Sequence, residues 1–266
     1  MTDDSPRRAL NSDLGLRLVT AAFLLPVAGI IYLGGTLAYV IIMVIGVIMA
    51  AEALLITGRK LTSLYAVLQI ALCIIPAASL IWTGEHLTSL LCFAGAVLFC
   101  LAISRSPAFV LIIAGISASV IALTGIIAHP EGVRWILVMI SVVICADSAA
   151  YFIGRAVGGP KLAPSISPSK TWSGAVAGLT AGTVAGFVVG FMMGFPLLSA
   201  GLLGLVMADL SIGGDLLESW FKRRYGVKDS GRLLPGHGGL LDRFDGYLLA
   251  APFLYIVLAF GGPYAG

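Results

Sequence analysis

The chain has 266 residues, of which 59% are hydrophobic and only 11% are charged, and its mean hydropathy is +1.04. A soluble domain carries roughly a quarter of its residues as Asp, Glu, Lys or Arg, so the composition excludes an ordinary soluble protein. It indicates an all-α, polytopic membrane protein. The net charge of +3 is small and reflects an asymmetry between loops, so we expect no nucleic acid among the partners.

Apolar runs long enough to cross a bilayer as helices, about 20 residues each, predict about nine transmembrane spans. They are expected at residues 14–34, 36–57, 61–83, 87–104, 107–128, 133–156, 171–194, 196–222 and 240–260. The polar residues 1–13 precede the first span, which we expect to remain in the protein as an uncleaved helix.

Basic residues predict the orientation of these spans, because short cytoplasmic loops carry the excess of Lys and Arg. With the N-terminus in the cytoplasm, every basic residue except Arg134 falls on the cytoplasmic side. We therefore expect residues 1–13 to form a cytoplasmic tail. Residues 215–245, here called the polar stretch, would face the cytoplasm. We expect the protein to lie in a cell membrane, such as a bacterial inner membrane.

Charged residues divide the chain into two regions. In residues 14–132 they lie at or near the ends of spans, with Glu52 as the exception, whereas residues 133–266 carry several embedded acids. We expect the first region to supply a scaffold and a lipid groove, and the second to be the catalytic region. For Glu52, the structural interpretation is a buried, paired or protonated acid, and the alternative is a substrate contact.

Glycine recurs at every fourth position of the span expected at residues 171–194. The positions are Gly174, Gly178, Gly182, Gly186, Gly190 and Gly194. Residues four apart share one face of a helix, so this stripe predicts close packing against another helix, either within the subunit or across a homodimer.

Acids at helical spacing mark the polar stretch. Asp215, Glu218 and Lys222 would share one face of a helix, and Asp242 and Asp245 another. Two helices that present carboxylates together make a site for Mg²⁺, which prefers carboxylates and substrate phosphates to a closed protein cage. The alternative is a set of intramembrane salt bridges with neighbouring arginines.

Basic residues and glycines lie between these two groups of acids. The basic residues are Lys222, Arg223, Arg224, Lys228 and Arg232. Glycines among them supply tight turns and exposed N–H groups, which together with a metal would make a phosphate site. The alternative is an anchor on anionic lipid headgroups.

An earlier loop carries a second set of candidates, Ser167, Lys170 and Thr171. Hydroxyls and a lysine at the positive end of the following helix suit an anionic group, although a plain capped loop fits as well. Asp147 is embedded in the span at residues 133–156, where an unpaired acid is costly, so it is a further candidate, with Arg155 as its structural partner in the alternative interpretation. Asp209 is similarly embedded, but the argument for it is weaker.

The polar stretch closely resembles the characteristic motif of the phosphatidate cytidylyltransferase family, the CDP-diacylglycerol synthases. The matching positions are Ser219, Lys222, Arg223, Lys228, Asp229, Gly231, Pro235, Gly236, His237, Gly238, Gly239, Asp242, Arg243 and Asp245. The segments GDLLES, ADSAAYFIGR and ISPSKTWSG are similar to other segments of the family, so the resemblance covers about the C-terminal half. Ser173 departs from the pattern, because the family usually has Glu there.

The resemblance implies transfer of CMP from CTP to phosphatidic acid, with CDP-diacylglycerol and pyrophosphate as products, for phospholipid biosynthesis. It implies Mg²⁺, with a second monovalent or divalent cation as a further candidate, held by Asp215, Asp242, Asp245, Asp147 and Glu218. The expected catalytic residues are Asp215, Asp242, Asp245, Lys222 and His237. The expected substrate-binding residues are Ser167, Lys170, Thr171, Arg223, Lys228, Asp229 and Arg243.

Two alternatives stay open. One is a nucleotidyltransferase or kinase that acts on another membrane lipid, since the sequence does not fix the lipid tail. The other is an ion-coupled transporter, although transporters of this kind show repeated halves with broken helices, and the charge of this chain is concentrated in one half.

Overall fold

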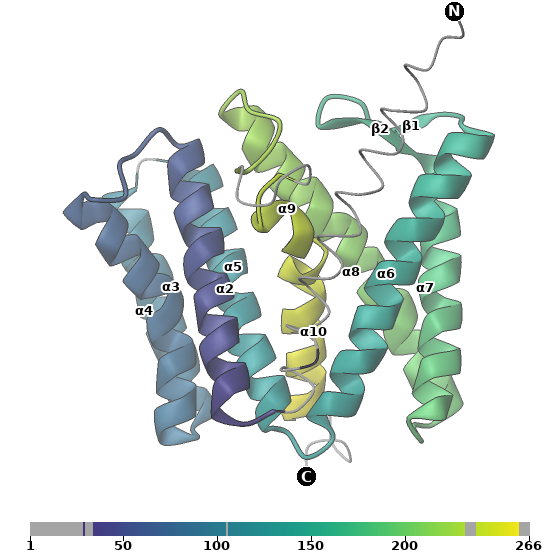
Figure 1. Ribbon diagram of the computed structural model, residues 1–266, viewed down its shortest axis with the longest axis horizontal. Coiled ribbons are helices and arrows are strands. Elements are labelled where there is room, and N and C mark those ends of the chain that lie inside the picture. The colour runs from purple at the N-terminus through teal and green to yellow at the C-terminus, as the bar shows by residue number, and fades with distance from the viewer. Residues whose placement is uncertain (1–28, 30–33, 105, 232–237, 261–266) are drawn as a thin grey trace, which may run out of the picture.

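The computed structural model describes residue 29 and residues 34–104, 106–231 and 238–260. Within them the chain is almost entirely helical, with one short hairpin of two strands (Figure 1). The helices are α2 (Gly35–Ile56), α3 (Leu64–Thr83), α4 (His86–Ile103), α5 (Pro107–Ala128), α6 (Gly132–Val157), α7 (Trp172–Met192), α8 (Leu197–Arg224), α9 (Leu241–Phe244) and α10 (Tyr247–Phe260). The strands are β1 (Lys161–Ala163) and β2 (Ser167–Thr171).

Seven of the described helices, α2 to α8, are long and apolar enough to cross a membrane. This confirms a polytopic membrane protein and places all seven of these helices within a few residues of expected spans. The first expected span, at residues 14–34, lies outside the described residues except at its edges. The number of spans, about nine, is therefore not reproduced among the described residues.

The last expected span, at residues 240–260, is wrong as one continuous helix. The chain turns at Asp245 and Gly246, where the Asp245 carboxylate accepts the Gly246 N–H at 2.7 Å. The remaining helix, α10, has 14 residues and is about 21 Å long at 1.5 Å per residue, which is short of a bilayer core of about 30 Å.

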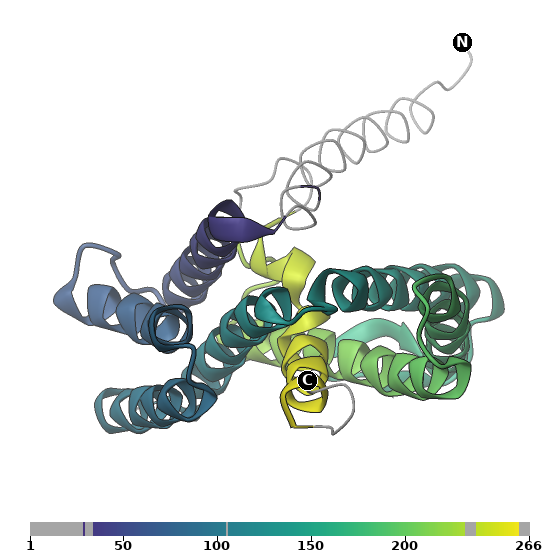
Figure 2. The ribbon, with the colours of Figure 1, turned by 90° about the horizontal axis from the view of Figure 1, so that it is seen from below.

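The helices form two groups with α10 between them (Figures 1 and 2). Helices α2 to α5 lie on one side, and α6, α7 and α8 lie on the other. Helix α10 packs against α5 of the first group and α8 of the second. The hairpin projects from one end of the second group, next to the C-terminal end of α8.

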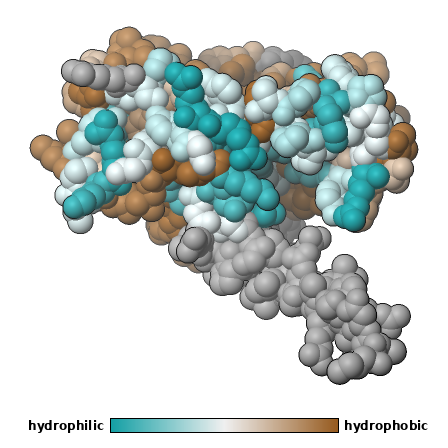
Figure 3. Space-filling model, turned by 90° about the horizontal axis from the view of Figure 1, so that it is seen from above, coloured by the Kyte–Doolittle hydropathy of each residue, from teal (hydrophilic) through white to brown (hydrophobic). Residues whose placement is uncertain are grey.

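Seen from that end, the hydrophilic residues gather across the face, and hydrophobic residues surround them at the outline (Figure 3). Many large apolar side chains on the sides of the bundle are exposed, such as Leu98, Phe152 and Leu198. This distribution is the one expected of helices that face lipid along their length and water at their ends.

The glycine stripe packs within the subunit along α7, but Gly194 lies beyond the end of this helix at Met192 and meets nothing within 4 Å. A Cβ at Gly178 would lie 3.0 Å from the Ala146 carbonyl oxygen of α6, and one at Gly186 would lie 2.7 Å from the Ala200 carbonyl oxygen of α8. Helix α7 therefore meets both neighbours at backbone distance, which is the packing that small residues permit in membranes. The homodimer stays a prediction.

Candidate active site

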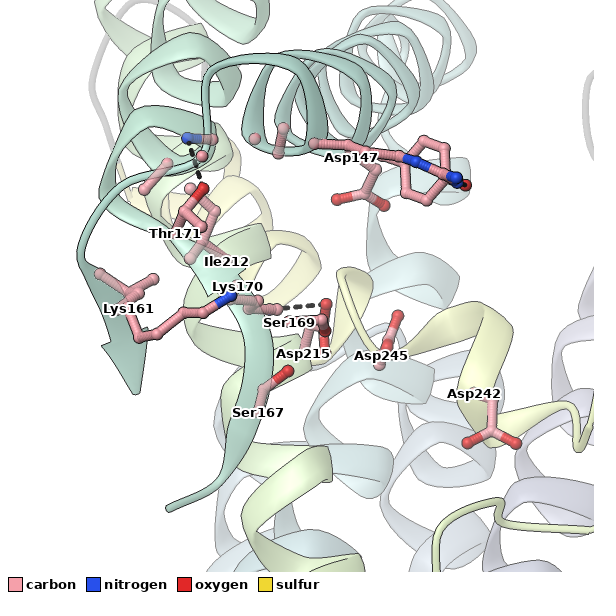
Figure 4. Close-up of a pocket in the computed structure, with 18 of the residues that line it drawn as sticks. Asp147, Lys161, Ser167, Ser169, Lys170, Thr171, Ile212, Asp215, Asp242 and Asp245 are labelled. Atoms are coloured by element: carbon pink, nitrogen blue, oxygen red, sulfur yellow. Dashed lines mark hydrogen bonds and ion pairs between the residues drawn. The ribbon is translucent and has the colours of Figure 1, made fainter. Parts of the chain in front are cut away.

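A cavity of about 770 Å³ opens at the hairpin end of the second group, among α6, the hairpin, α8 and α9 (Figure 4). Charged side chains of both signs line it. The acids are Asp147, Asp215, Asp242 and Asp245, and the bases are Arg155, Lys161, Lys170 and Arg243. Hydroxyl groups also line the cavity, from Ser167, Ser169 and Thr171. The cavity thus brings together residues that are up to about 100 positions apart in the chain.

Lys170 connects the hairpin to α8. In the antiparallel hairpin, Lys161 lies opposite Thr171. Lys170, which precedes Thr171 in β2, extends its ammonium to within 2.6 Å of the Asp215 Oδ2 atom. The Ser219 hydroxyl donates to the other Asp215 oxygen at 3.3 Å. Asp215 therefore has a fixed side-chain position while still lining the cavity.

Thr171 is buried and acts as the N-cap of α7, because its hydroxyl accepts the Gly174 N–H at 3.2 Å. The Ser173 hydroxyl lies 3.0 Å from this Thr171 oxygen and donates to the Gly158 carbonyl beyond the end of α6. At this departure from the family pattern, a serine ties the start of α7 to the end of α6. No acid is needed for that contact.

Lys222 lies at the centre of a buried group of charges beside the cavity. Its ammonium is 2.6 Å from the Glu218 Oε2 atom and 2.6 Å from the Asp242 Oδ1 atom. Glu218 is fully buried and does not line the cavity. The group joins α8 to α9, and the loss of one partner would leave an uncompensated charge in a buried place.

The second oxygen of Asp242 fixes the loop that precedes α9. It accepts the N–H and the hydroxyl of Ser230, both at 2.9 Å, and the N–H of Gly239 at 2.8 Å. Burial opposes ionisation of Asp242, but the hydrogen bonds outweigh it and lower its pKa to about 2. Gly238 has a φ of +78°, and a Cβ there would lie 2.5 Å from this oxygen, so glycine is required for the close approach.

Three acids line the cavity in addition to Asp242. Figure 4 shows Asp147 on α6, Asp215 on α8 and Asp245 after α9 around one space, with Asp242 beyond Asp245. Burial raises the pKa of Asp245 well above its ordinary value, and the charges of Asp215 and Asp147 add to the shift. A cation among these carboxylates would relieve their repulsion.

In the part of the chain that the structure describes, no three acids, histidines or cysteines form a closed metal-binding set. Mg²⁺ commonly binds through one or two carboxylates together with substrate phosphates and water, so it does not require such a set. The acidic wall and the facing lysines thus suit a metal that arrives with a phosphorylated ligand.

The remaining predicted residues are distributed differently. Arg243 lines the cavity, whereas Lys228 and Asp229 are exposed outside it. Arg223 donates to the Ile166 carbonyl at 3.2 Å and so holds the turn of the hairpin against α8. His237 lies outside the described residues.

The sequence reasoning missed Tyr151 and Lys161 as cavity residues and treated Arg155 only as a partner for Asp147. The Arg155 guanidinium donates to the Tyr151 hydroxyl at 3.1 Å. Spacing would have identified Tyr151 and Arg155, because positions 147, 151 and 155 are four apart and share one face of a helix. Asp209 is exposed on α8 and does not line the cavity.

Fold and cavity together define the class, a polytopic membrane protein with a cavity lined by charged side chains of both signs at one end of its helices. The family model described as the Cytidylyltransferase family matches residues 15–260. Because this match covers nearly the whole chain, the protein belongs to the cytidylyltransferase family.

Several bacterial proteins named phosphatidate cytidylyltransferase are similar to part of the chain. The one from Brucella suis biovar 1 is 41% identical over 129 residues, which are 48% of this chain and 48% of the relative. The Bacillus subtilis protein is 37% identical over 131 residues, 48% of each chain, and a Staphylococcus epidermidis protein is 38% identical over 131 residues, 48% of this chain and 50% of the relative. The matched part therefore spans about half the length of these relatives.

Proposed function

We propose that the protein transfers CMP from CTP to phosphatidic acid, forming CDP-diacylglycerol and pyrophosphate. The observation that carries the proposal is the cavity, in which Asp147, Asp215 and Asp245 from separate elements face Lys170 and Arg243. Membership of the cytidylyltransferase family and the names of the partly matching relatives support the nucleotide and the lipid.

In the proposed reaction, an oxygen of the lipid phosphate attacks the α-phosphorus of CTP. The bond from this phosphorus to the oxygen that bridges to the β-phosphate breaks, and pyrophosphate leaves. The attacking phosphate is already an anion at neutral pH, so no strong general base is needed. The site has to align two anionic groups and neutralise their charge.

Mg²⁺ would be held by Asp215 and Asp245, and Asp147 is the remaining cavity carboxylate for a second cation. When bound, Mg²⁺ supplies charge neutralisation for the triphosphate and the leaving pyrophosphate. We assign Asp242 and Glu218 to a different task, because their carboxylates are engaged by Lys222 and, for Asp242, by the loop before α9. They keep α9 in place beside the cavity.

Lys170 and Arg243 would bind phosphate oxygens, and Lys161 and Arg155 are the other bases of the cavity. Since Lys170 already contacts Asp215 at 2.6 Å, a phosphate between them would share the ammonium with the carboxylate. The Ser167 hydroxyl, which lines the same cavity, would donate to the ligand. Roles in catalysis or binding for His237, Arg223, Lys228 and Asp229 stay predictions.

The proposed site lies at the polar end of the apolar helices. A diacyl lipid would keep its tails in the bilayer while its phosphate enters the cavity from the level of the headgroups. We place this end in the cytoplasm of a bacterial cell, where CTP is available and where the basic loops are expected.

The test is transfer of label from CTP to lipid by the purified protein in detergent, with Mg²⁺ or with a chelator. CTP labelled at the α-phosphate should label phosphatidic acid, whereas CTP labelled at the γ-phosphate should not. Diacylglycerol, which lacks the phosphate, is the control acceptor. Label from the γ-phosphate would replace the proposal with a kinase, and transfer only to another phosphorylated lipid would replace the acceptor.

A further inference from the structure

We infer that Glu52 of α2 is a positioning residue for this site, which makes the first group of helices part of the catalytic apparatus. The inference rests on the proposed function for its effect on activity, but the contacts themselves do not depend on it. Glu52 is 5% exposed and belongs to a helix that contributes nothing to the lining of the cavity.

The Glu52 carboxylate binds the start of α9. Its Oε1 atom accepts the Leu240 N–H at 2.9 Å, and its Oε2 atom accepts the Leu241 N–H at 2.8 Å. The first N–H groups of a helix have no partner within the helix, and hydrogen bonds from N–H groups to a carboxylate are stronger than neutral ones. Glu52 therefore fixes the position and the orientation of the first residues of α9.

Two glycines of the polar stretch make room for this carboxylate. A Cβ at Gly231 would lie 2.7 Å from the Glu52 Oε1 atom, and a Cβ at Gly239 would lie 2.6 Å from the Oε2 atom. A side chain at Gly231 would displace Glu52, and one at Gly239 would displace Ser230 as well as Glu52. These glycines of the family-like motif thus serve a contact with α2.

Ser230 brings Glu52 and Asp242 to the same place. Its hydroxyl is 2.9 Å from the Asp242 Oδ2 atom and 3.3 Å from the Glu52 Oε2 atom. Both carboxylate oxygens are within hydrogen-bond distance of this one donor, and Asp242 is the nearer acceptor. The loop before α9 is therefore held between an acid from α2 and an acid from α9 itself.

The consequence reaches the cavity through a short piece of chain. Asp242 follows Leu241 directly, and Asp245 comes three residues later at the cavity wall. On the other side Lys222 of α8 fixes Asp242. Glu52 and Lys222 together set the position of Asp245 relative to Asp215, which decides how well a cation and a triphosphate are held.

The test compares Glu52→Gln with Glu85→Gln, a change of an exposed glutamate in the same group of helices. Glu52→Gln preserves size but places an amide NH₂ against an N–H donor. We expect kcat to fall, or the Mg²⁺ concentration for half-maximal rate to rise, by about 10- to 100-fold, as for other residues that orient metal ligands. Glu52→Asp, which keeps the charge on a shorter side chain, should recover part of the loss. Glu85→Gln should behave as the wild type.

Hydrogen exchange gives a readout that needs no activity. Peptides that contain Leu240 and Leu241 should exchange faster in Glu52→Gln, with no change in the peptides of α3 and α4. If wild type itself fails to transfer CMP, this exchange result still decides the inference. Unchanged exchange at Leu240 and Leu241, or unchanged kcat and Mg²⁺ dependence in the folded Glu52→Gln fraction, would overturn it.

Discussion

The two groups of helices are packed by different means. In the first, α5 is the central helix, and most of its residues are buried, with large side chains such as Phe109, Ile112 and Ile116 in the core. In the second, the buried residues of α7 are five glycines and one alanine. The glycines bring its backbone against α6 and α8. Large side chains fill the centre of the first group, whereas the seam along α7 in the second group relies on close backbone approach.

Charge follows the same division. The residues that line the cavity lie between positions 147 and 245, and the charged contacts around Lys222 and Lys170 hold its walls together. The difference indicates that the first group can vary in its apolar side chains as long as volume is kept. In the second group, single ion pairs and single glycine contacts determine the shape of the cavity and the packing of α7. Glu52 is a residue of the first group whose individual hydrogen bonds, to the Leu240 and Leu241 N–H groups, also matter for the site.

The largest effect on stability is expected at Lys222. Lys222→Met removes the cation that Glu218 and Asp242 share and should lower the free energy of unfolding by about 3–5 kcal/mol, as for a broken buried ion pair. Thermal unfolding in detergent measures it. Lys228→Met, which changes an exposed lysine of the same stretch, is the control, and equal melting temperatures for the two variants would contradict the buried group.

A second prediction compares a glycine from each group. Gly186→Ala on α7 would push a Cβ to 2.7 Å from the Ala200 carbonyl oxygen and should destabilise the protein by about 1–3 kcal/mol through overpacking. Gly95→Ala on α4 meets nothing within 4 Å and should be neutral or slightly stabilising, because alanine favours a helix. Equal unfolding temperatures for Gly186→Ala and Gly95→Ala would contradict the close contact between α7 and α8 at Gly186.

The smallest effect is expected at the start of α7. Thr171→Ala removes the hydroxyl that caps the helix and should cost about 1 kcal/mol. Thr171→Ser keeps the hydroxyl and should restore the melting temperature. Were Thr171→Ala to retain wild-type stability while raising the KM for CTP, the residue would be a substrate contact, as its position in the sequence also suggested.

Features that depend on neighbouring residues in the sequence were predicted well, whereas features that depend on contacts between distant residues were not. Hydropathy located α5 at its observed bounds, Pro107–Ala128, because a span is a local property of about 20 residues. The same average missed the turn at Asp245 and Gly246, where two residues interrupt an apolar run. The hairpin was missed as well, since its strands have three and five residues and no clear alternation.

The site was predicted in part for the same reason. Helical spacing grouped Asp215 with Glu218 and Lys222, but burial separates them, because Asp215 lines the cavity and Glu218 does not. The contact of Glu52 with Leu241 joins residues 189 positions apart, and nothing in the sequence around Glu52 indicates its partner. Such contacts are fixed by how the two groups of helices meet at α9 and α10.

The most direct test of the account compares two acids of α8, Asp215 in the cavity and Asp209 outside it. The measurement is the rate of Mg²⁺-dependent transfer of CMP from CTP to phosphatidic acid by folded Asp215→Asn and Asp209→Asn proteins. We expect Asp215→Asn to lower kcat by about 100- to 1,000-fold, the loss typical of one electrostatic group in an active site. Asp209→Asn should keep a rate close to that of wild type, because Asp209 does not line the cavity. Equal rates for the two variants would contradict the assignment of this cavity as the active site.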